Sequence, residues 1–171
     1  MKVSIAQTAK YDSHYNKHTH IVEHCAKNIK FNDFDIPEST EIHIRPIKQS
    51  SSRGGTTFGR ANYNKIRVEI ECRTRNIWQI VDTIAHELTH IEQFYKGRLD
   101  WDFRDNVWLW KNASFRVSRS QEEYWNEPWE VEARERSKKF VQSNFMKIEE
   151  IEREIRIGLA IPFSQRINKR K

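Results

Sequence analysis

Apolar residues follow two kinds of spacing along the chain, one typical of helices and one typical of strands. In residues 13–31 apolar side chains recur every three or four positions, which predicts an amphipathic helix. In residues 41–47 and 66–73 apolar and polar side chains alternate, which predicts two strands that each bury one face. The Ser- and Gly-rich run between them, QSSSRGGTTFG, is typical of a loop.

The next helical pattern predicts the central helix of the chain. Asn76, followed three residues later by Gln79, predicts a capped helix start, and Gly97 predicts a stop shortly after Tyr95. One stripe of this helix is expected to face the core: Ile77, Val81, Ile84, Leu88, Ile91 and Tyr95. Polar residues fall on the opposite side: Gln79, Asp82, His86, His90 and Gln93.

Residues 98–124 have no clear periodicity, apart from a hairpin predicted in VWLWKNASFRV. Pro128 suits the first turn of a third helix, which continues through Phe140 to about Ile157 with a break near Ser143 and Asn144. Strands and helices grouped in this way predict an α+β fold with a small mixed or antiparallel sheet packed on the helix that begins after Asn76.

Size and composition favour one globular domain. The chain has 171 residues, of which 37% are hydrophobic and 32% charged, so we expect a single domain over 1–171 with its core in about 40–140. No stretch is long and apolar enough for a membrane span, and the start lacks a secretory signal, which predicts a cytoplasmic protein. Cys25 and Cys72 are expected to be buried thiols rather than a disulfide.

A net charge of +6 favours contact with phosphate or acidic surfaces. Outside the short basic tail of residues 166–171, however, Lys and Arg alternate with Glu and Asp. We therefore interpret the charge mainly as solubility, and nucleic-acid binding as a weaker alternative.

Residues 86–90 read His-Glu-Leu-Thr-His. On a helix the spacing of four stacks the imidazoles of His86 and His90 on one side, where they can bind one Zn²⁺ per chain. Glu87 lies a quarter turn away, within reach of the water that the zinc activates, so it is predicted to act as the general base. The competing interpretation is an exposed helix with two histidines that bind nothing.

A catalytic zinc site usually has three protein ligands. No histidine follows His90, and the longer H-E-x-x-H-x-x-G-x-x-H pattern is absent because Gln93 and Lys96 stand at its Gly and His positions. A downstream carboxylate is therefore expected. The candidates are Glu127, Glu130 and Glu132, with Asp100, Asp102 and Asp105 as alternatives.

Helical geometry favours Glu130 among these. It shares the packing half of the third helix with Ala133 and Ser137, which are small enough to let another helix come close. Glu132 is expected to point outward and pair with Arg136, and Glu127 precedes the helix, where capping or loop contacts are expected.

The paired segments TIAHELTHIEQFYKGRL and YWNEPWEVEA resemble gluzincin-type zinc metallopeptidases, in particular small metallopeptidases encoded by tailed bacteriophages. The similarity covers about residues 66–137. It implies a zincin-like core, zinc, peptidase chemistry, Glu130 as the third ligand, and a location in the host cytoplasm or the virion. Many gluzincins carry an Asp directly after the Ala, where this chain has Arg134, so Asp82 or Asp102 is expected to orient the ligands instead.

Two further groups carry weaker signals. His20 and His24 have ligand spacing, but no acidic cluster accompanies them, so a second metal site is disfavoured. Five of the six Trp lie within residues 101–129 and are expected to form a satellite core joining the two metal helices, rather than a substrate cleft.

The expected reaction is hydrolysis of a peptide bond in a protein or peptide substrate, which could pair with the sheet edge near residues 56–72. Two alternatives remain open at this point. One is a non-catalytic virion or scaffold protein stabilised by zinc, and the other is a basic accessory protease acting on proteins bound to nucleic acid.

Overall fold

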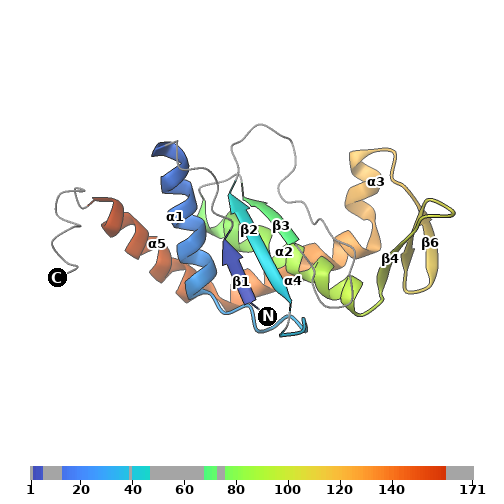
Figure 1. Ribbon diagram of the computed structural model, residues 1–171, viewed down its shortest axis with the longest axis horizontal. Coiled ribbons are helices and arrows are strands. Elements are labelled where there is room, and N and C mark those ends of the chain that lie inside the picture. The colour runs from blue at the N-terminus through green and yellow to red at the C-terminus, as the bar shows by residue number, and fades with distance from the viewer. Residues whose placement is uncertain (1, 6–12, 39, 47–67, 73–75, 161–171) are drawn as a thin grey trace.

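The protein is a mixed α+β chain, seen here in a computed structural model that describes residues 2–5, 13–38, 40–46, 68–72 and 76–160 (Figure 1). The α+β class predicted from the sequence is confirmed. The elements in chain order are β1 (Lys2–Ile5), α1 (Ser13–Asn28), β2 (Glu41–Pro46), β3 (Val68–Cys72), α2 (Ile77–Tyr95), β4 (Leu99–Asp102), β5 (Val107–Trp110), β6 (Ala113–Arg116), α3 (Gln121–Asn126), α4 (Pro128–Ser143) and α5 (Phe145–Ala160).

The first sheet has the order β1-β2-β3, and both pairings are parallel. The sequence pattern predicted a mixed or antiparallel sheet beside α2, and for these strands that prediction is wrong. Strand β1, which is only four residues long, was not predicted. Because β1 precedes α1 and β2 follows it, the two strands and the helix form a crossover unit, and such a unit pairs its strands in parallel.

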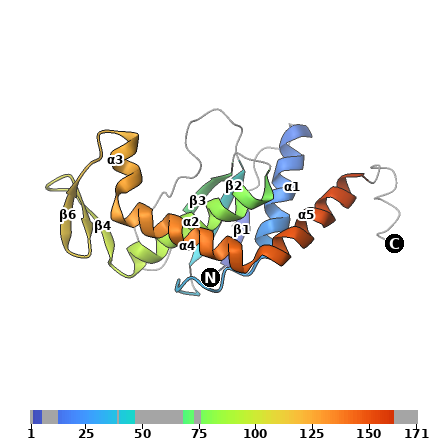
Figure 2. The ribbon, with the colours of Figure 1, turned by 180° about the vertical axis from the view of Figure 1, so that it is seen from behind.

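Helix α2 lies between this sheet and α4, as the two opposite views show (Figures 1 and 2). Its apolar stripe forms the centre of the main core together with side chains of α1, α4, α5 and the segment 31–36. Ile80, Leu88 and Ile91 have no exposed surface, and each such burial stabilises the fold by about 1.5–3 kcal/mol. Cys25 lies in the same core as a free thiol, and burial raises its pKa to about 12. The side chain of Cys72 lies outside the described residues.

The predicted start and stop of α2 are confirmed. The Asn76 side chain accepts a hydrogen bond from the backbone N–H of Gln79 at 3.2 Å. At the other end Gly97 has a φ of +64°, and the backbone N–H of Arg98 donates to the Gln93 carbonyl at 2.9 Å. This left-handed glycine closes the helix and turns the chain back, so that Arg98 lies beside the last turn of α2.

The polar side of α2 is partly buried, and one residue of the predicted apolar stripe is not. His90 and Gln93 are buried there, because α4 covers this side. Tyr95, which the stripe placed in the core, is 45% exposed. Helix α2 is therefore covered on two sides near its end, where His90 and Gln93 face another helix, whereas Gln79 is exposed.

The second sheet, β4-β5-β6, is an antiparallel meander at the end of the molecule opposite α5 (Figure 1). The predicted hairpin is its β5-β6 half, whose two-residue turn, Lys111 and Asn112, has positive φ at both positions. Leu99, Trp110 and Trp129 form a separate small core there, with Phe94, Trp108 and Phe115 packed against it. The predicted satellite core joining α2 and α4 is thus confirmed for Trp108, Trp110 and Trp129, whereas Trp125 is 48% exposed.

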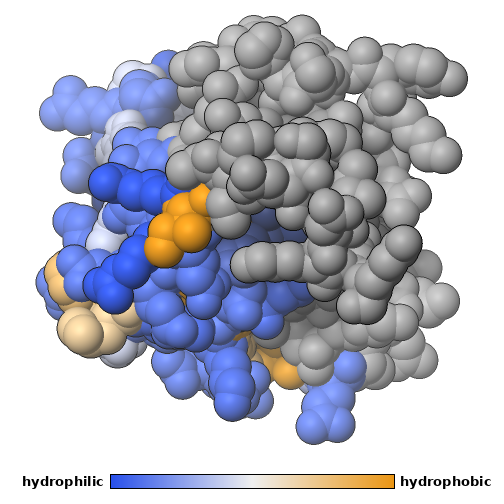
Figure 3. Space-filling view, turned by 90° about the vertical axis from the view of Figure 1, so that its left-hand side faces the viewer, coloured by the Kyte–Doolittle hydropathy of each residue, from blue (hydrophilic) through white to orange (hydrophobic). Residues whose placement is uncertain are grey.

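Helix α4 begins with Pro128 in its first turn, and Asn144 separates it from α5, as the sequence predicted. The end of the molecule formed by α5 presents mainly hydrophilic residues among those described (Figure 3). Within the described residues, we find no helix with the length and apolar character that crossing a membrane requires. The basic tail of residues 166–171 lies outside the described residues.

A buried carboxylate ties α2 to its neighbours. Glu92 is 3% exposed and accepts the backbone N–H of Asp35 at 3.0 Å. It also pairs with Arg136 of α4 at 2.6 Å and with Lys96 at 3.0 Å. Although burial raises its pKa, the hydrogen bonds from Arg136, Lys96 and Asp35 outweigh that effect and lower the pKa from 4.5 to about 2.

Glu92→Gln should therefore lower the free energy of unfolding by about 2 kcal/mol at neutral pH, the scale of hydrogen bonds to a charged group. A carboxylate whose folded pKa is depressed stabilises the fold above its ordinary pKa and loses that effect as pH falls through the folded value. The difference between wild type and Glu92→Gln should accordingly shrink between about pH 4.5 and pH 2. Urea unfolding at several pH values measures it, with exposed Glu135→Gln as the matched control. A difference independent of pH would contradict the assignment.

Candidate metal centre

The imidazoles of His86 and His90 project from one side of α2, as their spacing predicted. Their ring centroids lie 4.7 Å apart with the rings nearly perpendicular, and the two Nε2 atoms are 3.1 Å apart. The His90 side chain is 9% exposed and that of His86 is 20% exposed. One imidazole is therefore enclosed by protein, and the other borders solvent.

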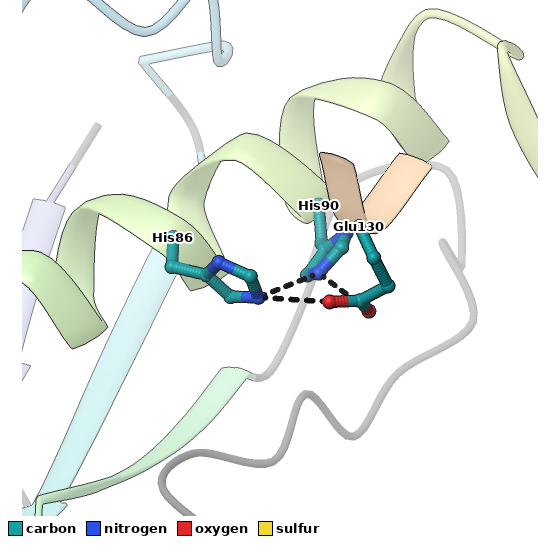
Figure 4. Close-up of side chains that lie close together, drawn as sticks. All are labelled: His86, His90 and Glu130. Carbon is teal, nitrogen blue, oxygen red and sulfur yellow. Dashed lines mark hydrogen bonds and ion pairs between the residues drawn. The ribbon is translucent and has the colours of Figure 1, made fainter. Parts of the chain in front are cut away.

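Helix α4 brings the Glu130 carboxylate to these two rings (Figure 4). Ala133 and Ser137 are buried on the same side of α4, and their small side chains allow the close approach to α2. Glu130 Oε2 lies 3.3 Å from His86 Nε2, and Glu130 Oε1 lies 3.2 Å from His90 Nε2. Within the described residues these three form the one group of His, Cys, Asp and Glu side chains that could hold a metal ion.

The distances within this group fit a zinc ion. Zinc bonds of about 2.0–2.2 Å arranged tetrahedrally put neighbouring ligand atoms about 3.3 Å apart. The two Nε2 atoms are 3.1 Å apart, and each lies 3.2 or 3.3 Å from a different oxygen of Glu130, so the separations are of this size. Two imidazole nitrogens and a carboxylate are also a donor set that zinc commonly takes, and they would leave a fourth position open.

Charge in the group favours an ionised Glu130. Burial raises its pKa, but hydrogen bonds with His86 and His90 outweigh burial and hold the pKa well below its usual range. For His90, burial lowers the pKa, and the hydrogen bond and charge of Glu130 more than compensate, so that the pKa is raised. The charge of buried Glu87 also raises the pKa of His90.

Two residues support the Glu130 carboxylate. The Tyr124 hydroxyl of α3 donates to Glu130 Oε1 at 2.6 Å. Arg134, which follows Ala133, places a guanidinium nitrogen 4.0 Å from Glu130 Oε2. The Arg134 side chain also stacks on the Trp125 ring and donates to the Trp125 carbonyl. At the position where the gluzincin pattern has an acidic side chain, this chain therefore has the positively charged Arg134, which faces the Glu130 carboxylate.

The other candidate carboxylates have different partners. Glu127 accepts from the Ser118 hydroxyl, which agrees with the loop contact expected for it, and burial raises its pKa. The predicted pairing of Glu132 with Arg136 is wrong, because Glu132 bonds to Arg98 at 2.5 Å and to Gln93 at 2.9 Å. The reason is that α4 packs along α2, so the Glu132 side of α4 also meets the end of α2.

The Asp candidates also lie outside the metal group. Asp102 was expected either as a ligand or as the orienting acid, but its carboxylate accepts the backbone N–H groups of Arg104 and Asp105 within the turn after β4. Asp100 accepts its neighbour's N–H. His90 is instead bonded through Nδ1 to Gln93 Oε1 at 2.9 Å. An amide therefore stands where an acid was expected.

Two hydrogen bonds of the site were not predicted from the sequence: that of Gln93 to His90 and that of Tyr124 to Glu130. The first could have been found, because Gln93 follows His90 by three residues and so shares its side of the helix. The second depends on how α3 lies against α4, which no local pattern indicates. In α1, His24 pairs with Glu154 at 2.7 Å and His20 is exposed, so neither joins a described three-ligand group.

Comparison with known proteins adds no relative: no family model, curated protein or solved structure matches this chain. The resemblance of the HELTH and YWNEPWEVEA segments to gluzincins therefore stays an expectation. What the chain itself supplies is a group of three donors from two packed helices, two of them buried, with a glutamate next to one of the histidines.

Proposed function

We propose that this chain is a zinc-dependent metallopeptidase that uses His86, His90 and Glu130 as metal ligands. The observation that carries the proposal is the convergence of three donor groups from α2 and α4, close enough together to bind one ion. An ionised Glu130 supports it, because a carboxylate must be deprotonated to bind a metal.

Zinc in such a site supplies a Lewis acid that activates water and polarises the carbonyl to be attacked. The chain's own contribution is the base. Glu87 directly follows the ligand His86 on α2, and its carboxylate is buried. In the proposed reaction Glu87 takes a proton from the attacking water and delivers it to the nitrogen of the leaving amine. His90 and Glu130 stay fixed by packing, and His86 borders the side from which substrate enters.

The proposed substrate is an extended peptide. Strand β3 is an edge strand of the described sheet, and it packs against α2, which bears both histidines. An exposed strand edge can pair with a peptide through main-chain hydrogen bonds, which gives affinity without requiring a particular sequence. Of the edge near residues 56–72 that the sequence suggested, only β3 itself lies within the described residues.

The direct test of the proposal is metal analysis. Purified protein is expected to hold about one zinc per chain, because three protein ligands make a site that retains the ion through purification. Elemental analysis gives the stoichiometry, and anomalous scattering at the zinc absorption edge gives the position in a crystal. Zinc bound elsewhere, or a chain that takes up no zinc on titration, would refute the proposal.

A further inference from the structure

The Gln93 amide hydrogen-bonds to the nitrogen of His90 that faces away from the other two ligands. His90 Nδ1 and Gln93 Oε1 are 2.9 Å apart, and Gln93 has no exposed surface. A residue in this position sets which nitrogen of the ring carries the proton, and therefore whether Nε2 presents a lone pair to a metal.

The orientation of the Gln93 amide follows from its other neighbours. Its Nε2 donates to the Trp129 carbonyl at 3.1 Å and to Glu132 Oε2 at 2.9 Å. The Trp129 carbonyl can only accept, and Glu132 is paired with Arg98 and accepts as well, so the reversed amide would place an oxygen against two oxygens. Oε1 must therefore face His90, and because an amide oxygen only accepts, His90 must donate from Nδ1. With the Nδ1 proton bonded to Gln93, only Nε2 can give up its proton, so the ring that binds a metal presents the Nε2 lone pair toward His86 and Glu130.

Glu132 fixes this arrangement from the outer side. Arg98 Nη1 donates to Glu132 Oε1 at 2.5 Å, and the turn at Gly97 holds Arg98 there. This ion pair leaves Glu132 as an acceptor toward Gln93. A chain of hydrogen bonds thus runs from Arg98 through Glu132 and Gln93 to His90.

We propose that Gln93, fixed by Glu132, is the positioning residue that presets His90 for metal binding. The inference rests on the proposed zinc site. Gln93 replaces the acid that was expected to orient a histidine, and Glu132 supplies the negative charge one hydrogen bond further away. Removing such a partner of a ligand typically lowers metal affinity about 10–100-fold.

Nuclear magnetic resonance tests the arrangement without metal. In metal-free protein at alkaline pH, where imidazoles are neutral, the ¹⁵N shifts of His90 should show the proton on Nδ1. In Gln93→Leu, which removes the acceptor at similar size, the Nε2–H form should appear. A wild-type His90 that carries its proton on Nε2 would overturn the proposal whatever the metal results are.

Zinc titration provides the second measurement. Gln93→Leu should bind zinc about 10–100-fold more weakly than wild type. Gln93→Glu alone should also weaken binding, because it sets a carboxylate against Glu132. Combining Gln93→Glu with Glu132→Gln restores both an acceptor for His90 and a donor to that acceptor, so the double variant should recover much of the affinity.

The outcomes separate this inference from the proposed function. If wild type takes up no zinc, the proposed function fails, and the His90 tautomer still decides the positioning role. If wild type binds zinc and Gln93→Leu binds it equally well, the positioning role is refuted while the metal site stands. A double variant no better than Gln93→Glu alone would also refute it. If Gln93→Leu does not fold, the wild-type tautomer and the paired variants decide.

Discussion

Glu87→Gln is expected to lower the rate of peptide hydrolysis at least about a hundredfold, the lower end of the range for loss of a general base. The amide has nearly the shape of the carboxylate but cannot take a proton from water. Glu87 is next to His86 in the chain but is not one of the three donors, so zinc content and fold should be unchanged. Mass spectrometry of a diverse peptide mixture before and after incubation measures the rate for whichever peptides are cleaved.

The matched control is Glu149→Gln, the same change at an exposed position of α5. It should cleave at the wild-type rate. If wild type cleaves a peptide and Glu87→Gln cleaves it equally fast, Glu87 is not the base. If wild type binds zinc but cleaves nothing in a broad peptide mixture, the chain is better explained as a protein that zinc stabilises.

Glu130→Gln is expected to weaken zinc binding by more than about a hundredfold, since loss of a direct ligand should exceed the 10–100-fold effect of a residue that only supports one. The amide oxygen is a neutral and weaker donor than the carboxylate, which is held ionised by His86 and His90. Its hydrogen bond from Tyr124 can persist, so the fold should tolerate the change. Competition with a chromophoric chelator measures the affinity.

Glu127→Gln provides the internal comparison. It makes the same chemical change three residues earlier, at a side chain that is also buried but contacts Ser118 instead of the histidines. Its zinc affinity should stay near that of wild type, whereas His86→Ala/His90→Ala should lose the metal completely. Equal affinities in wild type and Glu130→Gln would show that another residue is the third ligand.

The fold was predictable wherever a local pattern determines it. The ends of α2 follow from Asn76 and Gly97, and the break before α5 follows from Ser143 and Asn144. The direction of the strands was not predictable in this way. An alternating apolar and polar pattern is the same for a parallel and an antiparallel strand. The strand β1, Lys2–Ile5, is too short to be recognised from such a pattern, so the crossover that makes the sheet parallel was not predicted.

The site shows the same division. The convergence of His86, His90 and Glu130 could be predicted because helical spacing fixes which residues share a side. The partners of Glu132 could not, because they depend on how two helices lie together. Helical spacing suggested a local pairing of Glu132 with Arg136, but in the structure Glu132 bonds to Arg98, and Arg136 bonds to Glu92. Both acids had a possible arginine partner nearby in sequence or space, and the packing of α4 on α2 determined which ion pairs form.

The meander of β4, β5 and β6 has a consequence for the entropy of the chain. Glu130 must meet His90 across the whole connection between α2 and α4, and a flexible loop of that length would lose conformational freedom on closing. The meander pairs only neighbouring strands through short turns, so it can form from local contacts. Once it has formed, with Trp129 packed against it, the remaining connection is short. Bringing Glu130 to the histidines then closes only a short loop, which costs less conformational entropy than closing the whole connection.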